Sequence, residues 1–177
     1  MAQARTAREI LLLRHAKSSW EEPRRDDHAR PLAPRGRDAA DRMASYLQRR
    51  GVEPALILCS TAARTRETLA LILAGLRRTG RVEFEQGLYL AEGEEMLRRL
   101  QEVEDSVTSV MLVGHNPGLQ ELALMLCGGG EAAALKAMRA KYPTGALAEI
   151  AVPAAHWRDL RPGMGRLARF TVPRELP

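Results

Sequence analysis

The chain has 177 residues, 45% of them hydrophobic, and carries a formal net charge of +5. This length suits one well-buried domain, expected over residues 1–177 with a core from about residue 9 to about residue 173, and no apolar run approaches a membrane span. The N-terminus is polar and contains arginine. The apolar run that follows it, residues 10–13, is too short for a secretory signal, which predicts a cytoplasmic protein.

A basic chain suits an anionic partner such as phosphate, nucleic acid or a membrane surface. The arginines are scattered and aromatic residues make up only 4%, so neither nucleic acid nor a membrane is an expected partner. Cys59 and Cys127 lie in apolar runs and are expected to be buried, reduced thiols. The histidines show no paired ligand spacing, so no metal is expected, and His28 and His156 are interpreted as structural or solvated.

Short unbroken apolar runs predict strands that are buried on both faces, as in a parallel sheet. They cover residues 10–13, 55–59 and 110–113. Apolar residues at helical spacing predict helices over residues 34–50, 62–78, 93–104 and 117–127. Two further strands are expected over residues 146–152 and 167–172. This alternation predicts a three-layer α/β/α sandwich with a mostly parallel sheet.

Local signals mark the ends of the predicted helices. Gly51 stops the helix over 34–50, and the glycines at 128–130 stop the helix over 117–127. Asn116 is expected to cap its helix with Pro117 in the first helical position, and Ser60 or Thr61 is expected to cap the helix over 62–78.

The one long irregular stretch, residues 16–33, follows the first strand directly. A long polar loop in a compact domain is usually functional or mobile. Its position predicts that it forms a wall of a substrate pocket.

Chemically reactive side chains follow each of the three buried strands. The first strand runs into Arg14 and His15, the second reaches Arg64 in the first turn of the next helix, and the third precedes His115. Because ligands of open α/β sheets bind at the carboxyl ends of the strands, these side chains are expected to converge. Helix N-termini add N–H groups and partial positive charge, so the pattern predicts a site for a phosphate-sized anion.

The motifs at these positions resemble the histidine phosphatase superfamily, in the form used by the SixA-type phosphohistidine phosphatases. The segments that carry the resemblance are LLRHAKSSW at 12–20, DHARPL at 27–32, STAARTRET at 60–68, VGHNPGL at 113–119 and PTGA at 143–146. An ordered set of motifs, each placed after a buried strand, is far more specific than a single Arg-His pair. The resemblance implies a phosphoglycerate mutase-like fold, and no cofactor is expected.

The resemblance also implies that His15 is the nucleophile. A neutral imidazole can attack phosphorus, and nearby arginines disfavour the charged form of the ring. Arg14, Arg64 and His115 are then implied to stabilise the charge on the transferred phosphoryl group. Further candidates for substrate binding are Ser18, Lys17, Asn116 and Ser60. For Lys17 and Arg30, a plain loop role fits the sequence equally well.

The general acid is the feature that the resemblance leaves open. Many branches of the superfamily place a glutamate after the second arginine motif, where Glu92 is the possible acid, whereas the SixA-like group lacks it. A phosphohistidine has a nitrogen leaving group that can depart already protonated, so an acid is less necessary. A surface position for Glu92 would favour that substrate, and a position facing His15 would favour a small phosphoester.

The predicted function is a phosphatase with a covalent phosphohistidine intermediate that acts on phosphohistidine in a protein. The alternatives are a phosphatase of a small phosphoester, a phosphoryl mutase, and a non-catalytic module that binds anions. A mutase fits less well because the chain is short and has few residues that could form a lid over the substrate. A pure binding module gains nothing from a nucleophile at His15.

Overall fold

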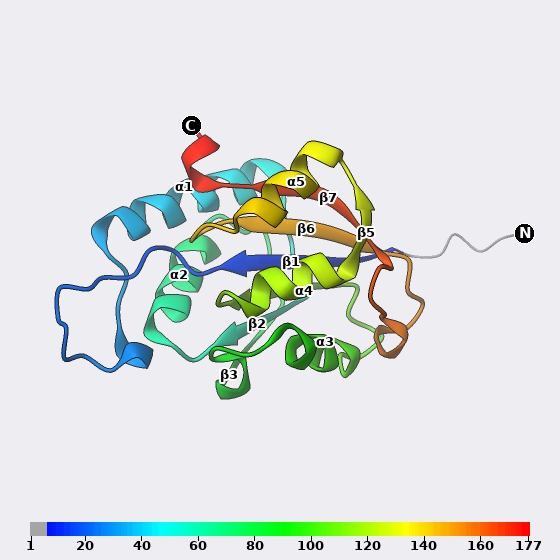
Figure 1. Ribbon diagram of the computed structural model, residues 1–177, viewed down its shortest axis with the longest axis horizontal. Helices are drawn as coiled ribbons and strands as arrows, with labels where there is room; N and C mark the ends of the chain where they lie inside the picture. The colour runs from blue at the N-terminus through cyan, green and yellow to red at the C-terminus, as the bar shows by residue number, and fades with distance from the viewer. Residues whose placement is uncertain (1–6) are drawn as a thin grey trace, which may run out of the picture.

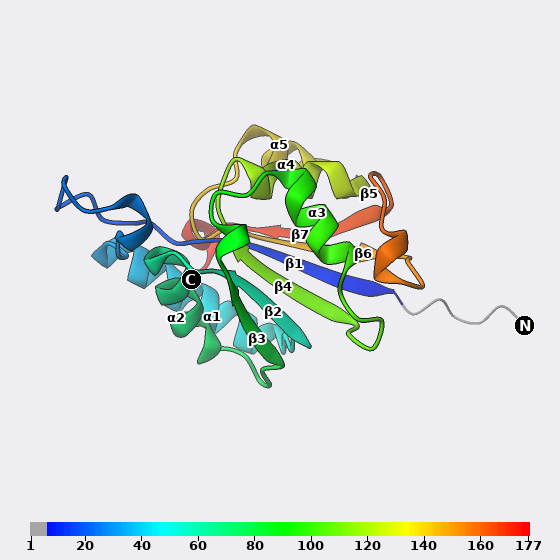
Figure 2. The ribbon, with the colours of Figure 1, turned by 90° about the horizontal axis from the view of Figure 1, so that it is seen from below.

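A single sheet contains all seven strands of the computed structural model, which describes residues 7–177. The strands are β1 (Arg8–Arg14), β2 (Leu56–Ser60), β3 (Arg81–Glu85), β4 (Ser109–Gly114), β5 (Cys127–Gly130), β6 (Leu147–Val152) and β7 (Gly165–Thr171). Their order across the sheet is β3-β2-β4-β1-β6-β7-β5 (Figure 1, with β4 labelled in Figure 2). The strands from β3 to β1 are parallel, as are β5 and β7, whereas β6 is antiparallel to β1 and β7. The three strands predicted from unbroken apolar runs, β1, β2 and β4, are therefore adjacent and parallel within a mixed sheet.

Within that part of the chain, five α-helices cover the two faces of the sheet (Figure 2). α1 (Pro34–Arg50) and α2 (Ala63–Leu73) lie on one face. α3 (Gly93–Gln101), α4 (Gly118–Leu126) and α5 (Ala132–Ala140) lie on the other. The predicted three-layer sandwich is confirmed. None of the helices formed by residues 7–177 has the length and apolar character needed to cross a membrane.

Burial on both faces explains why the central strands read as unbroken apolar runs. In β1, Ile10 and Leu12 belong to the core that α3 and α4 cover, whereas Leu11 and Leu13 belong to the core that α1 and α2 cover. All four side chains are fully buried. Burying a side chain of this size contributes about 1.5–3 kcal/mol, so β1 is held firmly between two cores up to the residue that precedes Arg14.

The ends of three helices can be compared with the limits that the sequence predicts. α1 spans the predicted residues 34–50, and Gly51 ends it in the left-handed region with a φ of 65°. α2 is shorter than predicted because it ends at Leu73. Two residues beyond this end, a Cβ on Gly75 would lie 2.0 Å from the carbonyl oxygen of Ala44, so the chain passes very close to α1 there. α3 also stops early, at Gln101 rather than at residue 104.

The predicted N-caps of α2 and α4 are wrong, whereas the predicted stop of α1 at Gly51 is confirmed. The residues in the N-cap positions of α2 and α4 are Ala62 and Pro117, and neither makes a side-chain capping bond. Ser60, Thr61 and Asn116 direct their polar atoms to neighbouring side chains instead.

Three elements lie outside the predicted pattern. β3 is an edge strand of sequence RVEFE, in which charged residues replace the apolar run of a central strand, as is common at sheet edges. The glycines at 128–130 do follow the end of α4, but they continue as the edge strand β5 beside β7. α5 buries only Met138, so it lacks the apolar stripe that would have predicted it.

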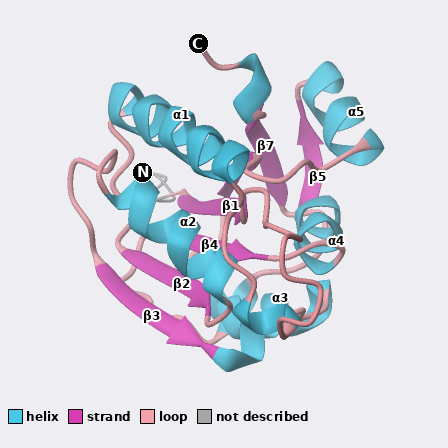
Figure 3. Cartoon of the chain, turned by 90° about the vertical axis from the view of Figure 1, so that its left-hand side faces the viewer, coloured by secondary structure: helices cyan, strands magenta, loops and turns pink. Residues whose placement is uncertain are grey.

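The strand register aligns the carboxyl ends of the central strands. Arg14 pairs with Gly114 in β4, and Cys59 in β2 pairs with Val113. Figure 3 views the molecule from this side, and the segment between β1 and α1 extends from the same end in Figure 1. The residues that follow β1, β2 and β4 therefore meet at one edge of the sheet.

Gly118 allows the start of α4 to approach the segment before α3. A Cβ at this position would lie 1.9 Å from the carbonyl oxygen of Ala91. Gly118→Ala is therefore expected to lower the free energy of unfolding by about 1–3 kcal/mol, as overpacking does elsewhere. Urea denaturation would measure the loss. Gly87→Ala is the control, because a Cβ there has no atom within 4 Å, and equal denaturation midpoints for both variants would contradict the prediction.

Candidate active site

Four polar side chains meet where the parallel strands end. Arg14 and His15 follow the core of β1, Arg64 lies in the first turn of α2, and His115 follows β4. The ring centroids of His15 and His115 are 5.2 Å apart. Both arginines act electrostatically on both rings. The structure thus brings together the four residues that the sequence placed at strand ends.

A backbone carbonyl fixes the tautomer of His15. Its Nδ1 lies 2.7 Å from the carbonyl oxygen of Ala16. A carbonyl oxygen only accepts, so Nδ1 carries the hydrogen and donates it. In the neutral ring, the lone pair is therefore on Nε2. The amide of Ala16 donates in turn to Thr68 Oγ1 at 3.0 Å, which ties this backbone segment to α2.

The environment of His15 and His115 keeps both rings neutral. Burial lowers the pKa of His15 to about 4, and the charges of Arg64, Arg14 and Arg30 contribute to the shift. Burial likewise lowers the pKa of His115 to about 3, with further contributions from His15 and Arg64. Both imidazoles are therefore uncharged at neutral pH.

A hydrogen bond with Ser60 orients the ring of His115. The Nε2 atom of His115 lies 2.8 Å from Ser60 Oγ, and Ser60 is fully buried. When the hydroxyl donates to Nε2, the hydrogen of the neutral ring is on Nδ1. That Nδ1 atom is buried and has no hydrogen-bond partner among residues 7–177. The Nδ1–H group of His115 is therefore available to donate to an anion.

The guanidinium of Arg14 has a hydrogen-bond partner at one nitrogen and none among residues 7–177 at another. Its Nη1 donates to the carbonyl oxygen of Tyr142 at 2.7 Å, while its Nε is buried without a partner within the described chain, 7–177. Burial and the neighbouring Arg64 lower the pKa of Arg14. A buried unpartnered donor is costly, so this side chain also suits a bound anion.

Asp27 and Tyr89 complete a network around Arg64. Arg64 Nη2 donates to Asp27 Oδ2 at 3.0 Å, Arg64 Nη1 donates to the Asp27 carbonyl at 2.6 Å, and the Tyr89 hydroxyl donates to Oδ2 at 2.6 Å. The Tyr89 hydrogen bond and Arg64 lower the pKa of Asp27 to about 2. The Tyr89 ring lies edge-on to His115, with centroids 5.5 Å apart. Asp27 is thus an ionised partner of the arginines.

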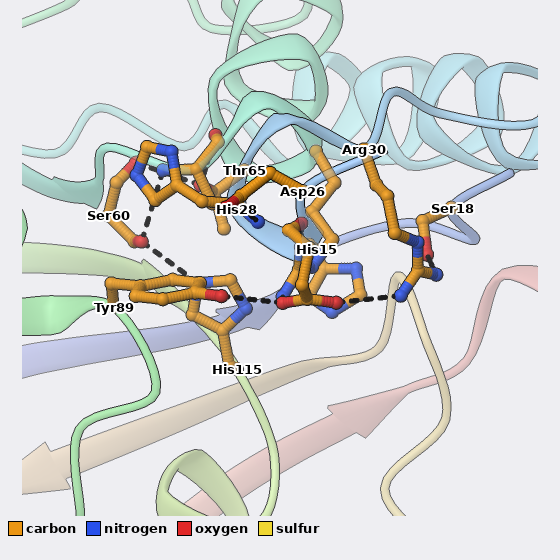
Figure 4. A network of polar contacts seen from close by, with 12 residues as sticks. His15, Ser18, Asp26, His28, Arg30, Ser60, Thr65, Tyr89 and His115 are labelled. Atoms are coloured by element: carbon orange, nitrogen blue, oxygen red, sulfur yellow. Dashed lines mark hydrogen bonds and ion pairs between the residues drawn. The ribbon is translucent and has the colours of Figure 1, made fainter. Parts of the chain in front are cut away.

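Arg30 joins the same network from the loop over residues 16–33. It is buried, with Nη1 donating to Asp27 Oδ1 at 2.8 Å and Nη2 donating to Ser18 Oγ at 2.5 Å. Its guanidinium stacks on the exposed ring of Trp20 at 3.3 Å. In Figure 4, His15 lies between the Arg30–Ser18 pair and the Tyr89–His115 pair. The loop over residues 16–33 therefore places side chains beside His15, and its role as the wall of a substrate pocket stays a prediction.

Asp27 and Tyr89 were not candidates from the sequence. Asp27 belongs to the short 3-10 helix η1 (Asp27–Ala29), and Tyr89 follows the 3-10 helix η2 (Gln86–Leu88), so neither follows a strand of the predicted pattern. The one available signal was the position of Asp27 in the DHARPL segment.

The remaining candidates take different places. Ser18 accepts from Arg30, and Lys17 lies half-buried beside it, with its carbonyl accepting from Ala33 N at 2.9 Å. Asn116 Nδ2 donates to Gln120 at 3.2 Å, and its Oδ1 is buried without a partner within 7–177. Glu92 is exposed in the N-cap position of α3.

The two other histidines and the two cysteines take no part in the contacts described above. His28 Nε2 contacts Thr61 Oγ1 at 2.9 Å, and His156 Nδ1 lies 2.6 Å from Asp105 on the surface. Both cysteines are free thiols. Cys59 is buried as expected, and burial raises its pKa to about 12, whereas Cys127 is only partly buried because it begins the edge strand β5. Within residues 7–177 the structure contains no cluster of three or more metal-ligating side chains.

Comparisons with known proteins identify related sequences and similar folds. A model of the histidine phosphatase superfamily (branch 1) matches residues 10–89. An uncharacterised protein of Mycobacterium tuberculosis is 37% identical over 164 residues, which are 92% of this chain and 100% of the relative. The protein assigned as phosphohistidine phosphatase SixA in Agrobacterium tumefaciens superimposes with a TM-score of 0.79 at 30% identity, covering 93% of this chain and 97% of that one. Its counterpart from Nakamurella multipartitia gives 0.80 at 28%, covering 93% and 95%.

The lowered pKa values of His15 and His115 predict how stability depends on pH. Unfolding returns each ring to a pKa near 6.5, so the unfolded chain binds more protons and stability falls as pH drops from about 6.5 towards 4. The two rings together are expected to contribute a slope of up to about 2.7 kcal/mol per pH unit near pH 5. Denaturation midpoints between pH 7 and 5 would measure it.

His15→Asn is the matched variant, because its amide retains a donor for the Ala16 carbonyl but does not titrate. It is expected to remove about half of that slope. Identical pH dependence in the variant and the natural protein would contradict the assignment of a lowered pKa to His15.

Proposed function

This chain belongs to the histidine phosphatase superfamily, and from that premise we propose that it hydrolyses phosphohistidine on a protein through a phosphorylated His15. It is a phosphatase by family. The observation that carries the proposed nucleophile is the buried, neutral ring of His15, with its hydrogen fixed on Nδ1 by the Ala16 carbonyl. The arrangement leaves Nε2 as the nucleophilic atom beside Arg14 and Arg64.

In the first step, Nε2 of His15 attacks phosphorus, and the bond between phosphorus and the substrate nitrogen breaks. The bonding electrons return to the leaving ring, which departs as a neutral imidazole when its other nitrogen already carries a hydrogen. In the second step, water attacks phosphorus and the bond to Nε2 breaks. The electron pair returns to His15, and the hydrogens of the water leave with the phosphate.

Arg14, Arg64 and His115 provide the charge stabilisation that phosphoryl transfer requires. Arg14 Nε and His115 Nδ1 are buried donors that have no partner within residues 7–177. Arg64 uses one hydrogen of each terminal nitrogen on Asp27 and retains others for the phosphoryl oxygens. Donors fixed in a buried pocket stabilise developing charge without having to reorganise.

The position of Glu92 supports phosphohistidine as the substrate class. Glu92 is exposed at the start of α3, where its backbone N–H donates to Glu95 Oε2 at 2.8 Å. The carboxylate of the arginine network, Asp27, has a pKa of about 2 and is ionised at neutral pH. Neither group is suited to protonate an alkoxide leaving group, whereas an imidazole leaving group does not need it.

Rapid quench with a protein that carries radiolabelled phosphohistidine tests the intermediate. The natural chain is expected to acquire an acid-labile, alkali-stable label that His15→Asn lacks, because Asn offers no nucleophilic Nε2. Circular dichroism would verify that the variant is folded. Full turnover by His15→Asn would contradict the nucleophile. A higher kcat/KM on p-nitrophenyl phosphate than on the phosphohistidine protein would contradict the substrate class.

Arg64→Ala is expected to lower kcat/KM by about 10²–10³, which corresponds to the loss of one donor from a buried oxyanion site. Steady-state kinetics on the same substrate would measure the change. Arg66→Ala is the matched control, since Arg66 lies two residues later in α2, is exposed, and is expected to leave the rate near that of the natural protein. Equal effects of the two substitutions would remove Arg64 from the site.

A further inference from the structure

We propose that a basic groove next to His15 binds acidic residues that flank the phosphohistidine of the protein substrate. The proposal rests on the function proposed above and extends it to the surface of the partner. The groove has a volume of about 340 Å³. Its polar and charged lining is Lys17, Arg35, Arg174 and Thr144, with Pro143 and Pro173 between them.

The groove is continuous with the segment that carries the nucleophile. Lys17 is two residues from His15, so their Cα atoms are at most about 7 Å apart. On the other side, the amide of Gly145, next to Thr144, donates to the carbonyls of Arg14 and His15 at 3.1 and 3.0 Å. The groove therefore borders the backbone that carries His15, where the residues next to a bound phosphohistidine would lie.

The C-terminal turn closes the far side of the groove. Arg174 lies in the 3-10 helix η4 (Pro173–Glu175), which contacts α1. Gly145 has a φ of 80°, and a Cβ on it would lie 2.8 Å from Pro173 Cγ. This close packing holds η4 against the loop beside His15 and so sets the position of the Arg174 backbone.

The positive charges in the groove are largely uncompensated. Neither Lys17 nor Arg35 forms an ion pair with any residue in 7–177. By contrast, Arg37, two residues after Arg35 in α1, pairs with Glu67 at 2.9 Å. Arg174 is mostly exposed, and its Nε is 3.8 Å from Glu175, at the outer limit of an ion pair.

The lining also distinguishes this groove from other hollows on the molecule. The hollow around Arg25 includes Glu21 and Glu22, and the hollow around Phe84 includes Glu67. By contrast, no acidic side chain lines the groove beside His15. Three cations within one groove attract carboxylates over a distance of about 8–10 Å at physiological salt. Acidic residues that flank the phosphohistidine of a substrate match this field.

Two synthetic peptides of equal length, each with one phosphohistidine, provide the test. One flanks the phosphohistidine with aspartate and glutamate, and the other flanks it with serine and glutamine. We expect the natural protein to hydrolyse the acidic peptide with at least tenfold higher kcat/KM at low salt, with the difference shrinking as salt is added. In Arg35→Glu/Arg174→Glu, the preference is expected to disappear or reverse, while turnover of the neutral peptide is unchanged.

Arg42→Glu/Arg158→Glu is the control for the change in net charge, since both arginines are exposed outside the groove, and it is expected to keep the preference. Equal kcat/KM for the two peptides, or a preference that survives Arg35→Glu/Arg174→Glu, would overturn the groove and leave the proposed function intact. Failure to hydrolyse either peptide, while p-nitrophenyl phosphate is turned over, would overturn the proposed function and the groove together.

Discussion

Two neutral imidazoles among arginines are the condition on which the site depends. His15 and His115 lie in a pocket where burial and the charges of Arg14 and Arg64 oppose protonation. A protonated His15 would have no lone pair and would add repulsion to a pocket that is already cationic. The same positive environment that keeps the ring neutral would also attract a phosphoryl group. The proposed nucleophile and the proposed substrate binding therefore depend on one electrostatic arrangement.

A carboxylate balances that arrangement. Asp27 accepts from Arg64, Arg30 and Tyr89, so the loop over residues 16–33 is tied to α2 and to the segment before α3 by charge-assisted hydrogen bonds. Without such a counterion, the buried guanidinium groups would repel one another. The loop thus contributes to the stability of the pocket.

The sequence was sufficient for the parts of the site that follow buried strands. His15, Arg64 and His115 could be placed together because unbroken apolar runs mark the central strands, and parallel strands end at one edge. Asp27 and Tyr89 could not, since they lie on irregular segments whose contacts depend on tertiary packing. The same limit applies to the edge strands β3 and β5: one is charged and the other is glycine, so neither has the pattern of a buried strand.

The atom that orients His15 belongs to the backbone. Because the Nδ1 hydrogen is donated to the carbonyl of Ala16, no change of side chain at position 16 removes the acceptor itself. In many hydrolytic enzymes a carboxylate performs this duty, and one mutation can delete it. Here the path of the main chain sets the orientation of the His15 ring. Substitutions of single side chains cannot delete this acceptor as long as β1 keeps its place in the sheet.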